Sequence, residues 1–238
     1  PLPLDTITLL FNSGWNIERI FRLCFQRMNN LKNAPGASGP TPSRSPYFIE
    51  FISAVKYLRL LQIEDAINLS YQEENGVPQL ILNINDADKN RAEARQFALA
   101  ANVEPGKTRY VLAFSADSNK TNHIRVVTRS LLGIMFYISQ AVEVPSKDIS
   151  KGKVTQTQTR DGKIFDWDKV MGDLLKIRSA SEKPQEYPMT IFYRGSWFYI
   201  NDSDLSSKST FSLLSQIFSL QAGKIKDNAP LLTLPIGQ

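Results

Sequence analysis

The chain has 238 residues, of which 42% are hydrophobic and 21% charged, a composition typical of a globular protein. Its net charge is +5, but the basic residues are spread along the whole chain, which argues against a nucleic-acid-binding protein. A single cysteine, Cys24, excludes an intramolecular disulfide framework and a cysteine-based metal site within this sequence, and no apolar run approaches the roughly 20 residues of a membrane-spanning helix.

Residues 1–64 are predicted to be mostly helical. Apolar residues between 5 and 32 recur at helical spacing, interrupted at Ser13-Gly14, and Asn16 is the expected N-cap of the main helix. The Pro-rich segment 33–46 holds four prolines and two glycines, so it is predicted to be a loop, either a flexible linker or an ordered extended segment. A second amphipathic helix is expected to start at Ser45-Pro46.

Residues 65–238 are predicted to form an α+β body that packs with residues 1–64 as one compact unit. A hairpin followed by a helix recurs at 66–101, 109–143 and 189–222. Because hairpins produce antiparallel pairing, the fold class is predicted to be α+β, with an antiparallel sheet of hairpin–helix (ββα) units and an N-terminal helical portion.

Finer features of this body follow from turn residues. Asn75-Gly76 is expected within a first hairpin loop longer than two residues. Asp161-Gly162 is expected to turn a second pair of strands within 153–167, and residues 231–234 are expected to form a last strand.

The sequence indicates no catalytic residue, metal site or cofactor. His123 is the only histidine, at the start of a predicted strand, and no Gly-x-Ser-x-Gly motif presents a serine nucleophile. One histidine and one cysteine do not make a transition-metal ligand set. The stretch Pro105–Thr108 ends like a P-loop, but position 101 is Ala where that motif requires Gly.

Two aspartates, Asp202 and Asp204, precede the last predicted helix. Helix capping by Asp204 or Ser203 is the favoured interpretation, since a carboxylate is stabilised at the positive end of a helix. A calcium loop starting at Asn201 lacks the required Gly and Glu. A hydrolase that uses the two carboxylates is the weaker alternative.

The aromatic stretch after the turn at Arg194-Gly195 contains the candidate ligand-binding residues. Alternation along a strand points Trp197 and Tyr199 to the same face, and Arg194 lies nearby in the turn. These three side chains are typical of a pocket for a small ligand or a glycan, but packing in a core is the favoured interpretation of the two rings.

Several strings resemble a family of uncharacterised bacterial lipoproteins. They are Arg-Gly-x-Trp-Phe-Tyr-Ile-x-Asp-x-Asp-Leu-x-Ser-Lys-x-Thr-Phe from Arg194, the segment Asn33 to Pro42, Ser13-Gly14-Trp15, and residues 128–133. The resemblance covers nearly the whole chain and implies a periplasm-facing protein of the bacterial envelope, with a lipid anchor on a cysteine that precedes Pro1. It implies no particular activity.

The sequence thus leads us to expect a non-enzymatic, envelope-tethered protein that binds another envelope protein. The Pro-rich segment is the expected interaction loop, with Pro35, Pro40, Pro42 and Arg44 as its candidate contact residues. The alternative is a small-ligand or glycan binder near Trp197. The oligomeric state is left open.

Overall fold

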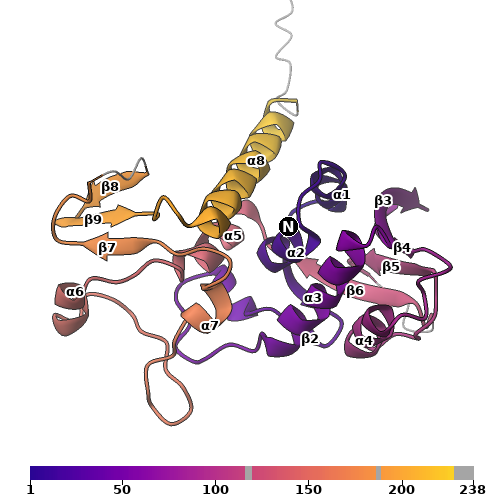
Figure 1. Ribbon diagram of the computed structural model, residues 1–238, viewed down its shortest axis with the longest axis horizontal. Coiled ribbons are helices and arrows are strands. Elements are labelled where there is room, and N and C mark those ends of the chain that lie inside the picture. The colour runs from indigo at the N-terminus through magenta and orange to yellow at the C-terminus, as the bar shows by residue number, and fades with distance from the viewer. Residues whose placement is uncertain (116–119, 186–188, 228–238) are drawn as a thin grey trace, which may run out of the picture.

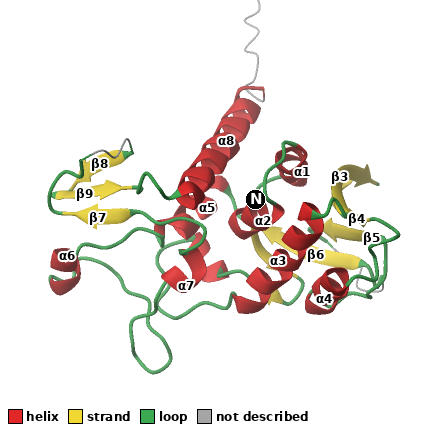
Figure 2. Cartoon of the chain, in the orientation of Figure 1, coloured by secondary structure: helices red, strands yellow, loops and turns green. Residues whose placement is uncertain are grey.

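The computed structural model describes residues 1–115, 120–185 and 189–227, and this part of the chain contains two β-sheets. The two sheets lie at opposite ends of the molecule, with α5, α7 and α8 between them (Figure 1). Helices α1 to α4 lie beside the larger sheet, and α8 projects away from the body (Figure 2).

The larger sheet has six strands in the order β2-β1-β6-β5-β4-β3, and the smaller has three in the order β7-β9-β8. The strands are β1 (Phe25–Met28), β2 (Leu31–Lys32), β3 (Ile67–Glu74), β4 (Val77–Ile84), β5 (Arg109–Ala113), β6 (His123–Thr128), β7 (Arg178–Ala180), β8 (Thr190–Tyr193) and β9 (Ser196–Tyr199). The helices are α1 (Leu4–Asn12), α2 (Ile17–Cys24), α3 (Ile49–Ile63), α4 (Ala92–Ala100), α5 (Leu131–Ser139), α6 (Ser146–Ser150), α7 (Asp168–Met171) and α8 (Leu205–Asp227), with a 3-10 turn at Pro35–Ser38.

The predicted fold class is confirmed, since helices combine with sheets whose pairings are mostly antiparallel. The first predicted hairpin is β3–β4, but its turn is tighter than expected. Asn75 and Gly76 alone connect the strands, with φ angles of 52° and 74°. Positive φ at both positions matches the twist of a two-residue hairpin.

The second predicted hairpin is wrong, because β5 and β6 are parallel. Val111 pairs with His123 and Ala113 with Arg125. The start of β6 therefore lies opposite the middle of β5. Two apolar strands on either side of a polar loop show the same residue pattern whether they pair in parallel or antiparallel, so the sequence could not distinguish the two.

The helix predicted to continue to residue 32 ends at Cys24. Asn16 is its N-cap as predicted, since the Asn16 Oδ1 atom accepts a hydrogen bond from the Glu18 amide at 2.8 Å. From Phe25 the chain instead forms β1, which pairs with the central strand β6. Phe25 and Met28 could be buried equally well in a continued helix or in a strand. Pairing with the distant strand β6 selects the strand.

The Pro-rich segment is an ordered loop. The prediction that the next helix starts at Ser45-Pro46 is wrong. Helix α3 begins at Ile49, while the Ser45 amide donates to the Gln158 carbonyl at 2.9 Å. Beyond this segment, the strands expected within 153–167 are reduced to one bridge between Gln158 and Ile164. The strand predicted at 231–234 lies outside the described residues.

Arg129, which is fully buried, fixes the start of the Pro-rich segment against the α2–β1 junction. Its guanidinium donates to the carbonyls of Arg22 at 3.0 Å and Phe25 at 2.6 Å, to the Asn33 carbonyl, and to the Ser38 hydroxyl at 3.0 Å. It also lies 3.8 Å from the ring centroid of Tyr137, so backbone carbonyls and an aromatic face solvate a charge that burial has removed from water.

Candidate functional site

The hairpin β8–β9 forms as the sequence predicts, with a two-residue turn at Arg194 (φ 49°) and Gly195 (φ 74°). The Lys147 ammonium group on α6 donates a hydrogen bond to the Gly195 carbonyl. The turn is thereby attached to the segment that precedes β7, although the Arg194 side chain itself is exposed.

Of the three predicted ligand-binding residues, Trp197 and Tyr199 share one face of β9, and both are half-buried. The Trp197 ring lies 5.1 Å from the ring of Phe192, and the Lys183 ammonium group lies 5.5 Å from the Trp197 ring centroid. The structure thus places Trp197 beside Phe192 and Lys183, while Arg194 remains at the turn.

Strand β8 is the outer strand of the smaller sheet and carries exposed apolar side chains. Ile191 is 65% exposed, Phe192 57% and Tyr193 61%. Tyr193 and Ser196 flank the two-residue turn, so pairing alternation directs the backbone groups of Ile191 and Tyr193 toward β9 and those of Thr190 and Phe192 outward. Among the described residues no further strand pairs with this outer edge, and an apolar edge of this kind is a template for another strand.

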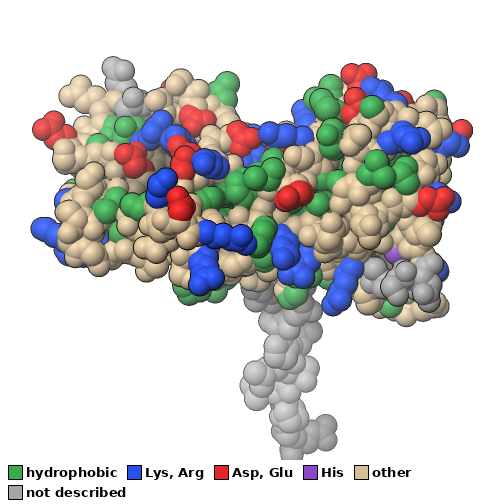
Figure 3. Space-filling model, turned by 90° about the horizontal axis from the view of Figure 1, so that it is seen from below, with side chains coloured by type: hydrophobic (Ala, Val, Ile, Leu, Met, Phe, Trp, Pro, Cys, Tyr) green, Lys and Arg blue, Asp and Glu red, His purple; other side chains and the backbone are tan. Residues whose placement is uncertain are grey.

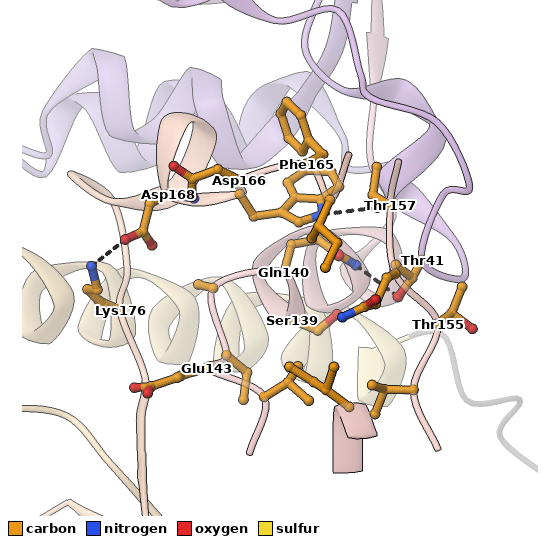
Figure 4. Close-up of a pocket in the computed structure, with 18 of the residues that line it drawn as sticks. Thr41, Ser139, Gln140, Glu143, Thr155, Thr157, Phe165, Asp166, Asp168 and Lys176 are labelled. Carbon is orange, nitrogen blue, oxygen red and sulfur yellow. Dashed lines mark hydrogen bonds and ion pairs between the residues drawn. The ribbon is translucent and has the colours of Figure 1, made fainter. Parts of the chain in front are cut away.

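A cavity of about 740 Å³ lies near the junction of the smaller sheet and the body. In Figure 4, Glu143, Asp168 and Lys176 lie on one side of it, and threonines including Thr41 and Thr157 lie on the other. Lys176 and Asp168 form an ion pair at 2.5 Å, and Glu143 accepts a hydrogen bond from the Ser179 amide at 3.2 Å. Glu143, Asp168 and Lys176 are therefore each engaged in a contact with a neighbouring group of the protein.

The Pro-rich segment contributes to a second concavity, a groove of about 810 Å³ that contains Arg44. The other predicted contact residues of this loop lie elsewhere along it. Pro35 begins the 3-10 turn, Pro40 is exposed, and the Pro42 carbonyl accepts a hydrogen bond from the Thr157 hydroxyl at 2.7 Å.

A smaller apolar groove of about 260 Å³ is lined by residues of both α5 and α8. Met135 of α5 and Phe211 and Phe218 of α8 line it, and they are 49%, 44% and 56% exposed. No contact in the described part of the chain indicates what would occupy this groove.

Asp204 caps α8 as predicted. Its carboxylate accepts hydrogen bonds from the Ser207 amide at 2.9 Å and the Ser207 hydroxyl at 2.6 Å. Burial alone would raise the pKa of Asp204, but these hydrogen bonds hold that pKa below its usual value. Asp202 forms an ion pair with Lys208, so each carboxylate has a partner within the first turns of α8, which differs from the open cleft that the hydrolase hypothesis requires.

The remaining reactive groups do not gather at these sites. Cys24 is fully buried, and burial raises the pKa of its thiol to about 12. His123 lies half-buried at the start of β6. Within the described ranges no group of three or more His, Cys, Asp or Glu side chains could hold a metal ion, and no helix is long and apolar enough to span a membrane.

The sequence could not indicate the cavity of about 740 Å³, because its lining comes from segments far apart in the chain, such as Thr41, residues 139–144 and residues 164–168. None of these segments carries a motif. Acidic and basic side chains are also interspersed over much of the face seen in Figure 3, so charge patterning does not single out this site. Comparison with protein-family models found no match, and comparisons with curated proteins and with solved structures found none either.

Proposed function

We propose that the protein is a non-enzymatic, envelope-tethered binding protein, and that it recognises an extended segment of another envelope protein along the outer edge of β8. The observation that carries the proposal is the combination of an open strand edge with three exposed apolar side chains, Ile191, Phe192 and Tyr193. Isolated apolar residues on a surface are ordinary, but a contiguous set on an unpaired edge is typical of an interaction site.

Strand addition would use both the outward backbone groups and the exposed apolar side chains of β8. A partner strand would hydrogen-bond to the outward backbone groups of Thr190 and Phe192, which supplies affinity independent of sequence. Ile191 and Tyr193 would meet its side chains on one face of the sheet, and Phe192 beside Trp197 would meet them on the other. Full burial of each such apolar side chain contributes roughly 1.5–3 kcal/mol. Selectivity would therefore depend on which side chains of the partner strand, at every second position, bury these residues.

Site-directed photocrosslinking tests the edge. A photoreactive amino acid at Tyr193 is expected to give a discrete protein adduct in intact cells of the source organism. The same amino acid at Leu99 of α4, which is also exposed, is the control and is expected to give none. Adducts of the same kind and yield from both positions, or none from Tyr193, would contradict binding at β8.

The envelope location is supported by the sequence resemblance alone. It is tested on the natural gene product by metabolic labelling with a radioactive fatty acid and by fractionation of the cells. Incorporation of the label and recovery with membranes are expected. An unlabelled protein in the cytosolic fraction would contradict the location without affecting the β8 measurement.

The cavity of about 740 Å³ favours a second candidate function, binding of a small polar ligand such as a short glycan. Gln140 lines this cavity together with the threonine hydroxyls opposite Glu143 (Figure 4). A panel of short glycans and amino acids would be screened for a rise in melting temperature in the wild type and in Gln140→Ala. A rise that Gln140→Ala abolishes supports this function, and no rise with any compound contradicts it for these ligand classes.

A further inference from the structure

Among the residues that the structure describes, two arginines and no acidic residue line the groove beside the Pro-rich segment. Its walls are residues 43–47 on one side and residues from 158 to 162 on the other, and Arg44 and Arg160 lie on opposite walls. Ser43, Ser45, Thr159 and Gln158 add hydroxyl and amide groups to the same lining. The groove therefore offers hydrogen-bond donors and positive charge.

Tyr47 brings a third cation to the groove. The Lys32 ammonium group lies 4.8 Å from the Tyr47 ring centroid, and the Arg160 guanidinium donates to the Tyr47 hydroxyl at 3.3 Å. These contacts orient both cations around one ring. Since Tyr47 is 59% exposed, its surroundings remain accessible to a ligand.

In the part of the chain that the structure describes, no acidic side chain neutralises the two arginines. Within the described ranges neither Arg44 nor Arg160 forms an ion pair, whereas Asp161, the residue next to Arg160, is bonded to other groups. Its carboxylate accepts from the Thr159 hydroxyl and forms an ion pair with Lys163 at 3.2 Å. Uncompensated guanidinium groups that face one concavity are typical of an anion-binding site.

Backbone hydrogen bonds hold the two walls in fixed register. The Ser45 amide donates to the Gln158 carbonyl and the Gln158 amide to the Ser43 carbonyl, both at 2.9 Å, which forms a parallel bridge. The Tyr47 carbonyl accepts from the Ala34 amide at 2.9 Å, which joins this wall to the loop fixed by Arg129. The Cα positions of Arg44 and Arg160 are therefore set before a ligand arrives, and only side-chain freedom is lost on binding.

We propose that this groove binds the phosphate group of a ligand, with Arg44 and Arg160 as the paired donors and Lys32 as a further charge. A phosphate monoester carries a charge of about −1.5 to −2 at neutral pH, which matches three uncompensated cations better than a single carboxylate does. Guanidinium groups also match the geometry of phosphate oxygens with two parallel hydrogen bonds. This site is independent of the β8 edge.

The phosphate could belong to a soluble compound or to a lipid headgroup, and the binding measurement separates these sources. One arm titrates the protein with glycerol phosphate by calorimetry. The other measures sedimentation with vesicles of phosphatidylcholine that contain phosphatidic acid, compared with phosphatidylcholine alone. Binding in either arm supports the proposal and identifies the source, and binding in neither arm contradicts it.

Charge-matched variants show whether the groove is responsible. Arg44→Gln/Arg160→Gln is expected to weaken binding at least about tenfold, because both bidentate donors are lost. Arg27→Gln/Arg125→Gln removes the same charge from two exposed arginines on the large sheet and is expected to change binding less than about twofold. Melting temperatures of both variants establish that they fold.

Two results would overturn the site. An equal loss of binding in both double variants would mean that net charge alone attracts the phosphate. Acetate that binds as tightly as glycerol phosphate would contradict the preference for a doubly charged group. Tyr47→Phe, which removes the hydroxyl that orients Arg160, is expected to weaken binding by about threefold without loss of the arginines.

Discussion

At the scale of single residues, the fold depends on a few buried polar side chains that the apolar pattern does not reveal. Arg129 is the largest case, since its guanidinium joins the end of α2, the start of β1 and the Pro-rich segment. Burial lowers the pKa of Arg129 to about 10, so the side chain remains protonated at neutral pH. The sequence shows only an arginine before Ser130, and arginine is seldom fully buried in proteins.

Replacement of Arg129 is expected to be strongly destabilising. Arg129→Met removes the donors of several buried carbonyl groups at once, so the free energy of unfolding should fall by about 3–5 kcal/mol. Arg27→Met, at an exposed position of β1, is the control, with a change within about 0.5 kcal/mol. The midpoints of urea unfolding measure both, and a similar small change in the two variants would contradict the structural role of Arg129.

The cap of α8 gives a second residue-scale prediction, and it depends on pH. Asp204→Ala is expected to lower stability by about 1 kcal/mol at pH 7, while Asp202→Ala removes only a surface ion pair and should change stability by at most about 0.5 kcal/mol. Because the folded pKa of Asp204 is depressed, its stabilisation is present above the unfolded pKa and is lost as pH falls through the folded pKa.

Unfolding curves from pH 7 down to acidic pH therefore should show the difference between wild type and Asp204→Ala shrinking. A difference that stays constant over that range, or that is larger for Asp202→Ala, would argue against the cap.

At the scale of elements, local turn chemistry predicted the two hairpins with glycine-containing turns, β3–β4 and β8–β9, and pairing between distant segments decided the other elements. Asn75-Gly76 and Arg194-Gly195 carry positive φ angles, which explains why the sequence located both turns. In contrast, Phe25 to Met28 have apolar residues that suit a helix or a strand, and only pairing with β6 selects the strand. The start of α3 was misplaced because the Ser45 amide bonds to Gln158, a residue more than a hundred positions away.

The turn at Arg194-Gly195 provides the test at this scale. Gly195→Ala is expected to cost about 1 kcal/mol, because alanine is strained at a φ of 74°. Gly36→Ala is the matched control, since the Gly36 backbone does not have positive φ and an added Cβ atom would meet only the Pro42 Cβ atom at 3.6 Å. Thermal unfolding measures both; equal losses would contradict the conformation of the turn.

At the scale of the whole molecule, the sequence predicted the α+β class but not the arrangement of its strands. Strands β5 and β6 are parallel neighbours, and strands from residues 25–32 extend the same sheet. The candidate sites also differ in how much of each is visible in the sequence. Ile191 to Tyr193 are adjacent in the sequence, but only the structure shows that they are exposed on an outer strand. Arg44 and Arg160 are far apart in the sequence and meet only through the fold.

The open edge of β8 is the central claim, and a proline tests it most directly. Thr190→Pro removes a backbone N–H that faces away from β9, so the hairpin should remain while strand addition is blocked. Thr190→Val keeps that N–H and is the matched control. With the photoreactive amino acid at Tyr193, the account predicts at least about tenfold less adduct in Thr190→Pro than in Thr190→Val. Equal adduct yields in the two folded variants would contradict it.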